Sequence, residues 1–96
     1  MIPPAATIMV VEDEVGTRTT LCGILEDAGY RVIGLARGSD ALEMIRSHHF
    51  DAVITDIRLP DSGGLEILEL AKEINPDAAV IMMTGYTEED LVKRAI

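Results

Sequence analysis

The chain has few of the residues on which several classes of protein depend. It has no tryptophan, one cysteine, and eight basic side chains against seventeen acidic ones, a formal net charge of -9. One cysteine cannot form an intrachain disulfide, and no Cys/His cluster has the spacing of a zinc site, so we expect a reducing, cytoplasmic compartment. The acidic excess opposes direct binding to nucleic acid and to anionic membranes, because both require a basic patch.

Long hydrophobic runs and targeting signals are also missing. The longest apolar run, residues 78–83, is far shorter than the roughly 18 to 20 residues that span a bilayer, and it predicts a buried strand instead. Residues 1–6 contain neither basic side chains nor a long apolar stretch, so they do not resemble a secretory signal and we expect them to be disordered. With 96 residues and no repeat or linker, the chain is expected to form one small domain.

What is present is an alternation of apolar runs with segments of helical periodicity. The four runs, each predicted to be a strand, are residues 7–11, 31–36, 51–56 and 79–83. The segments between them place apolar residues at helical spacing over about 15–28, 39–49 and 65–74, the last ending before Pro76. Parallel strands joined by helices make right-handed crossovers. The pattern therefore predicts an α/β fold, a doubly wound parallel sheet covered on both faces.

Individual residues predict the ends of these helices. Gly29 supplies a C-terminal stop for the first, and Ser39 or Asp40 is the expected N-cap of the second. Residues 87–90, a threonine followed by three acids, resemble the N-terminus of a further helix. On the first helix, Cys22 is expected to be a small buried hydrophobic residue.

Acidic and hydroxyl side chains follow three of the predicted strands. Glu12 and Asp13 come after the first strand, Asp56 ends the third and Thr84 follows the fourth. Ligands of open parallel sheets bind at the carboxyl ends of the strands, so we expect these side chains to converge. Any one of them alone is more often a solvated loop residue or a cap, but three converging strand ends are harder to dismiss. Clustered carboxylates repel unless a cation neutralises them, and hard oxygen ligands suit Mg2+.

Three segments of the chain match a known family. Residues 10–14 (VVEDE), 56–65 (DIRLPDSGGL) and 83–86 (MTGY) resemble the receiver domains of two-component response regulators. The resemblance spans essentially the whole chain, residues 1–96, and it implies a flavodoxin-like receiver fold.

The resemblance also assigns roles to particular residues. It implies that Asp56 is the phosphoacceptor, that Asp13 and Asp56 ligate Mg2+, and that Glu12 holds the metal through water. Arg58 would contribute a backbone carbonyl to the metal, and Thr84 would bind the phosphoryl group. Most family members have aspartate where this chain has Glu12, and the longer side chain suits an outer-shell role.

The implied function is that of a signalling switch rather than a turnover enzyme. A sensor histidine kinase would pass its phosphoryl group to Asp56, and the change would be read by an output domain or partner protein outside this chain, as in transcription regulators. The main alternative is a receiver-like interaction module that is not phosphorylated. A flavodoxin-like flavin carrier is disfavoured because residues 12–14 would repel the flavin phosphate. A dehalogenase-like phosphatase is disfavoured because that family has an Asp-x-Asp motif early in its chain, whereas this chain has residues 56–58 (DIR) in the middle.

One further expectation concerns what receiver domains have beyond their fourth helix. They continue into a fifth strand, a lysine followed by proline, and a fifth helix, whereas this chain stops at Ile96. We therefore expect a C-terminally incomplete receiver domain, in which neither Lys72 nor Lys93 can replace the lysine because neither follows a strand. Phosphorylation would then be slow or absent, and an exposed sheet edge would favour a homodimer or aggregation.

Overall fold

The computed structural model describes residues 6–59, 61 and 63–83. Strands and helices alternate as predicted: β1 (Thr7–Val11), α1 (Val15–Asp27), β2 (Arg31–Leu35), α2 (Gly38–Ser47), β3 (Ala52–Asp56), α3 (Gly64–Ile74) and β4 (Ala79–Met83). The helix expected from Thr87, and residues 1–5 of the expected disordered N-terminus, lie outside the described residues.

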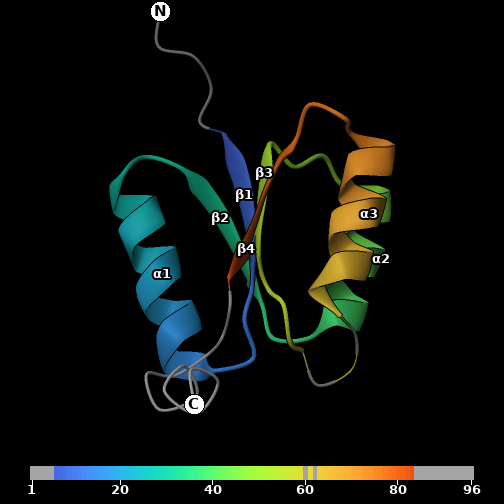
Figure 1. Cartoon of the computed structure of the whole chain (residues 1–96). Helices are drawn as coiled ribbons and strands as arrows, with labels where there is room; N and C mark the ends of the chain where they lie inside the picture. The colour runs from blue at the N-terminus through green and yellow to red at the C-terminus, as the bar shows by residue number, and fades with distance from the viewer. Residues whose placement is uncertain (1–5, 60, 62, 84–96) are drawn as a thin grey trace, which may run out of the picture.

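The four strands form one parallel sheet in the order β2-β1-β3-β4. Helix α1 covers one face of this sheet, and α2 and α3 cover the other (Figure 1). This arrangement confirms the predicted doubly wound α/β fold. Because all strands run in the same direction, their carboxyl ends lie along a single edge, the lower one in Figure 1. Among the described residues, no helix is long and apolar enough to cross a membrane.

The two faces of the sheet are packed unequally. The larger core lies between the sheet and the α2/α3 pair, and its buried members are Met9, Val11, Ala41, Ile45, Phe50, Val53, Ile67 and Ala71. The smaller core contains Ile8, Val10 and Ile54 beneath α1. Helix α1 contributes no buried residue, and Cys22 is half-buried, so the expectation of a buried Cys22 is wrong. The reason is that α1 has no neighbouring helix on its face among the described residues.

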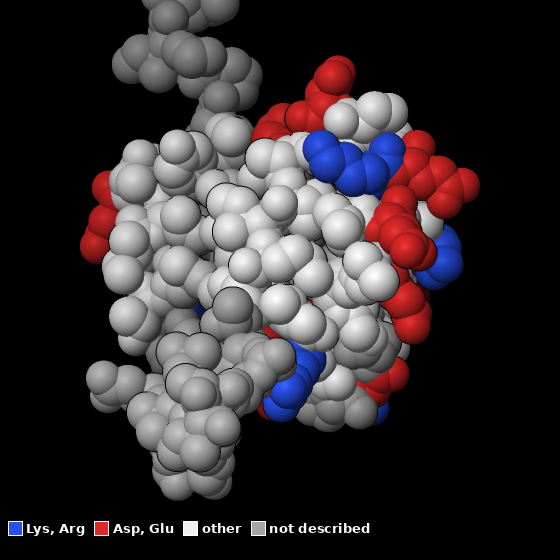
Figure 2. Space-filling model, viewed as in Figure 1, with Lys and Arg blue, Asp and Glu red and all other residues white. Residues whose placement is uncertain are grey.

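Strand β4 is also more exposed than its apolar sequence suggests. None of its five residues is buried, and Ile81 is 53% exposed. The strand pairs with β3 alone because it lies at the end of the described sheet. Figure 2 shows that the surface over β4 is uncharged, whereas acidic side chains lie along the outer side of α3. The prediction of a buried strand at residues 78–83 is therefore right about the strand and wrong about its burial.

Helix α2 is capped from a distant part of the chain. The predicted caps, Ser39 and Asp40, lie inside the first turn instead, and the residue at the N-cap position, Arg37, makes no capping side-chain bond. The carboxylate of Asp61 accepts hydrogen bonds from the backbone N–H groups of Gly38 (2.8 Å) and Ser39 (2.9 Å). Bonds from the Ser39 side chain and from these two N–H groups lower the pKa of Asp61 to about 2. A local pattern of capping residues could not reveal a partner so far away in the sequence.

Two glycines are required by backbone geometry. Gly29, after α1, has a φ of 99°, which confirms its predicted role as the helix stop. Gly64, the first residue of α3, packs directly against the chain at the end of β3: a Cβ there would lie 2.3 Å from the carbonyl oxygen of Asp56. The start of α3 is thus held against the backbone of Asp56.

The close approach at Gly64 predicts that replacing two helical glycines by alanine changes the free energy of unfolding in opposite directions. Gly64→Ala should lower the free energy of unfolding by about 1 to 3 kcal/mol, because the backbone of β3 must move to admit the methyl group. Gly23→Ala, inside α1, should raise it by about 0.5 to 1 kcal/mol, because nothing lies within 4 Å of the added Cβ and alanine favours helix. Urea denaturation of both variants measures this. Equal effects of the two substitutions would contradict the assigned contact.

Candidate metal centre

Three acidic side chains meet at the carboxyl edge of the sheet. Glu12 and Asp13 directly follow β1, and Asp56 is the last residue of β3, which pairs with β1. One carboxylate oxygen from each residue lies within 4.8 Å of the others. The expected convergence is therefore present for the ends of β1 and β3.

Two of the three carboxylates are almost fully shielded from water. Glu12 is 6% exposed and Asp56 is 5% exposed, whereas Asp13 is exposed. Backbone N–H groups hold the buried pair in place: Glu14 donates to Glu12 Oε1 (3.2 Å) and Arg58 donates to Asp56 Oδ1 (3.0 Å). Each buried carboxylate thus has a fixed orientation set by the loop that follows its own strand.

The surroundings of Glu12 disfavour its negative charge. Burial raises the pKa of Glu12, and a hydrogen bond with the Asp56 side chain and the charges of Asp56 and Asp13 raise it further, against the opposing bond from Glu14. A cation among these oxygens would reverse this effect, since it favours the ionised form. Carboxylate oxygens with an exposed member are the donor set that Mg2+ accepts while keeping several waters. The residues present therefore fit Mg2+.

The other two predicted site residues are Arg58 and Thr84. Arg58 lies in the loop after β3, and its backbone is next to Asp56 through the bond described above. Thr84 lies outside the described residues. The strand before it ends beside the same loop, because the carbonyl oxygen of Met83 accepts a hydrogen bond from the N–H of Ile57 (2.9 Å).

Arg18 is a residue near the site that the sequence patterns do not reveal. It lies in the second turn of α1, and its Nη1 donates to the carbonyl oxygen of Glu12 (2.9 Å). The guanidinium therefore ties α1 to the end of β1, where the acidic residues begin. The sequence feature that could have predicted this contact is the spacing of Arg18 from the end of β1, because a long side chain one turn into the following helix can reach back to that strand.

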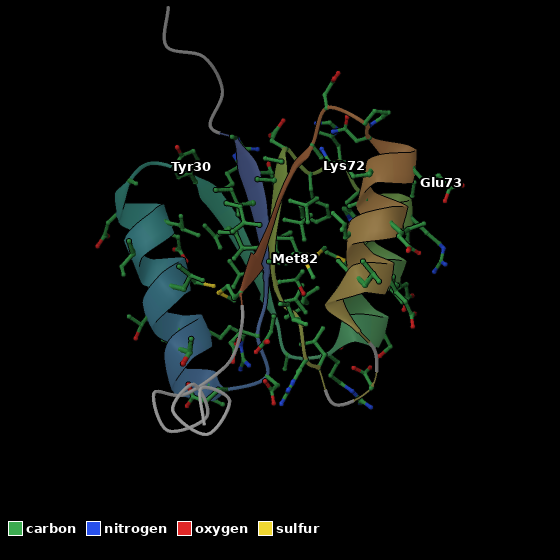
Figure 3. The ribbon with its side chains drawn as sticks, viewed as in Figure 1. Tyr30, Lys72, Glu73 and Met82 are labelled. Atoms are coloured by element: carbon green, nitrogen blue, oxygen red, sulfur yellow. The ribbon has the colours of Figure 1, made fainter. Side chains whose placement is uncertain are left out.

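Lys72 lies at the other edge of the sheet, close to the start of β4 (Figure 3). Its Nζ donates to the carbonyl oxygens of Pro76 and Ala78. This confirms that Lys72 cannot act as a cationic partner at the carboxyl edge. Lys93 lies outside the described residues.

Comparison with known proteins assigns the family. The model of the response regulator receiver domain matches residues 8–96, so the chain belongs to the receiver domains of two-component response regulators. The fold agrees: a CheY-like receiver domain protein from Methanospirillum hungatei has a crystal structure that superimposes with a TM-score of 0.81 at 35% identity, covering 92% of this chain and 71% of that one.

Two relatives of this chain differ greatly from each other in length. The transcriptional regulatory protein ZraR of Klebsiella oxytoca is 38% identical over 93% of this chain, which spans only 20% of that protein. The sporulation initiation phosphotransferase F of Bacillus subtilis is 33% identical over 92% of this chain, which spans 71% of it. The same domain therefore occurs both as most of a small protein and as a minor part of a large one.

The raised pKa of Glu12 predicts how stability depends on pH without metal. The folded state holds the Glu12 proton more tightly than the unfolded chain, so this residue costs stability as pH rises above about 4.5. Glu12→Gln removes that cost. In buffer with a chelator, we expect the unfolding free energy of this variant to improve relative to the parent as pH rises from about 4.5 to about 7.

Glu14→Gln is the matched control, whose effect on stability should change with pH only below about 4.5. Hydrogen bonds from the Thr17 side chain and from the N–H groups of Thr17 and Gly16 lower the pKa of Glu14 at the start of α1. Its stabilising effect is lost only as pH falls below about 4.5, so the deficit of Glu14→Gln should grow as pH rises toward about 4.5 and stay constant from there to about pH 7. Parallel slopes for the two variants would show that Glu12 is not in the electrostatic environment described.

Proposed function

We propose that Asp56 accepts a phosphoryl group from a sensor histidine kinase and that Mg2+ supports the transfer. The observation that carries this proposal is the position of the Asp56 carboxylate: it is 5% exposed, oriented by the Arg58 N–H, and clustered with Glu12 and Asp13 at the sheet edge. A carboxylate that must attack phosphorus needs both a fixed direction and neutralisation of the charge around it.

The other site residues take the following roles in this proposal. Asp13 and Asp56 ligate Mg2+ directly, and Glu12 holds it through water, in keeping with its longer side chain. The backbone carbonyl of Arg58 completes the protein ligands, and Thr84 binds the phosphoryl oxygens. Support for the metal ligands comes from the 4.8 Å cluster of carboxylate oxygens, and support for Arg58 comes from its bond to Asp56.

The chemistry is a transfer between two nucleophiles. An oxygen of the Asp56 carboxylate attacks the phosphorus of a phosphohistidine, a P–O bond forms as the P–N bond breaks, and the nitrogen keeps the bonding pair. When bound, Mg2+ supplies positive charge to the transferring oxygens. The N–H of Arg58, already directed at Asp56, is placed to stabilise the same oxygens.

The product would act as a switch for a second protein or domain. The name of the Klebsiella oxytoca relative describes a transcriptional regulator, of which this chain matches one fifth. We propose that phosphorylated Asp56 alters the surface of this domain through Thr84, and that an output domain or partner reads the change, with transcription regulation as its outcome.

Intact-mass measurement tests the proposed chemistry. Incubation with acetyl phosphate and Mg2+ should add the mass of one phosphoryl group, slowly in this chain and faster in a version extended through the lysine that receiver domains carry, because that lysine stabilises the transferring group. A chelator should prevent the addition in both. Asp56→Asn should take up none, because the nucleophile is lost. Asp40→Asn should be labelled as the parent is, since Asp40 lies in the first turn of α2 and is not one of the three clustered carboxylates. An extended chain that gains no phosphoryl group would refute the proposal and favour an interaction module without phosphorylation. An Asp56→Asn variant that gains one would refute Asp56 as the acceptor.

A further inference from the structure

Backbone contacts close the base of the loop that follows Asp56. The N–H of Arg58 donates to Asp56 Oδ1 (3.0 Å), and the N–H of Gly64 donates to the carbonyl oxygen of Ile57 (3.1 Å). Arg58 and Gly63 also face each other as an antiparallel bridge. These contacts fix both ends of the loop against β3 and the start of α3.

A different contact holds the tip of this loop. Asp61 Oδ1 accepts a hydrogen bond from the N–H of Gly38 (2.8 Å), and Oδ2 accepts one from the N–H of Ser39 (2.9 Å). Both donors belong to the first turn of α2, whose own N-cap residue, Arg37, makes no side-chain capping bond. Asp61 therefore serves as the cap of a helix that lies 22 to 23 residues earlier in the chain.

Helix α2 is a firm anchor for the loop. Its residues Ala41 and Ile45 are 0% and 4% exposed in the larger core, and the helix packs against α3 and the sheet. Of the loop residues that the structure describes, Ile57 is 40% exposed, and Leu59 packs against the core. Two hydrogen bonds accepted by one carboxylate fix its direction as well as its distance, so they limit how Asp61 can move relative to α2.

We propose that Asp61 is a positioning residue for the phosphoacceptor site. By fastening the loop to α2, its carboxylate holds the backbone of Arg58 in place, so that the N–H and the carbonyl of Arg58 are arranged before the cation and the phosphoryl group bind. A loop ordered in advance does not lose conformational entropy on binding, which raises affinity. This inference rests on the proposed function, because it assigns Asp61 to the same site.

Two substitutions at position 61 weaken the contact with α2 to different extents. Asp61→Ala removes both acceptors, and Asp61→Asn keeps one oxygen. Titration calorimetry should show Mg2+ affinity falling in the order parent, Asp61→Asn, Asp61→Ala, with a loss of about tenfold for alanine, the lower end of the range for residues that orient metal ligands. The rate at which acetyl phosphate labels Asp56 should fall in the same order.

Two matched variants separate positioning from lost stability and lost charge. Asp51→Asn makes the same chemical change at the opposite edge of the sheet, where Asp51 Oδ2 accepts the N–H of Thr7 (2.8 Å). Asp40→Asn removes one negative charge from the first turn of α2. Both variants should bind Mg2+ and be labelled at the level of the parent.

The backbone amide resonances of Gly38 and Ser39 show directly whether the contact with Asp61 has been lost, and circular dichroism shows which variants are folded. A folded Asp61→Ala that has lost the contact yet binds Mg2+ as tightly as the parent would overturn the inference, as would an equal loss of affinity in Asp40→Asn. If Asp61→Ala does not fold, the same criterion applies to Asp61→Asn. A chain extended through the family's lysine that takes up no phosphoryl group overturns the proposed function instead, so the two failures are distinguishable.

Discussion

Repulsion among three carboxylates is the constraint around which the carboxyl edge of this domain is built. Two unit charges about 4 Å apart repel by about 4 kcal/mol at the effective dielectric constant near a protein surface. Glu12 and Asp56 are nearly buried as well, and the raised pKa of Glu12 is the consequence. Backbone N–H groups from the two following loops offset part of this cost. A divalent cation bound among these oxygens would offset the rest.

The fold brings the loops after β1 and β3 together and restrains both of them. The pairing of β1 with β3 brings Glu12, Asp13 and Asp56 to the same edge. Gly64 lets α3 begin against the backbone of Asp56, and Asp61 ties the loop between them to α2. The strongly packed α2/α3 face thus supports the loop that follows Asp56. The lightly packed α1 face supports the other loop, through the bond from Arg18 to the Glu12 carbonyl.

Local sequence predicted most of the fold and the acidic cluster, because both follow from short-range patterns. Continuous apolar runs located every described strand, and acids at or immediately after the ends of two of those strands located Glu12, Asp13 and Asp56. The failures all involve partners distant in sequence. Asp61 caps α2 in place of Ser39 or Asp40, Cys22 is half-buried because no second helix flanks α1 among the described residues, and β4 is exposed because of its place in the sheet. Periodicity records how apolar a segment is, but not which elements will cover it.

The most direct test of the central claim is to locate the bound cation. Mn2+ can replace Mg2+ at oxygen sites, and its unpaired electrons broaden the NMR signals of nearby nuclei. The account predicts that low concentrations of Mn2+ broaden the amide signals of residues 12–14 and 56–58 first, and that Asp13→Ala largely removes this effect. Broadening centred on the acidic outer side of α3, or broadening at residues 12–14 that persists unchanged in Asp13→Ala, would contradict the account.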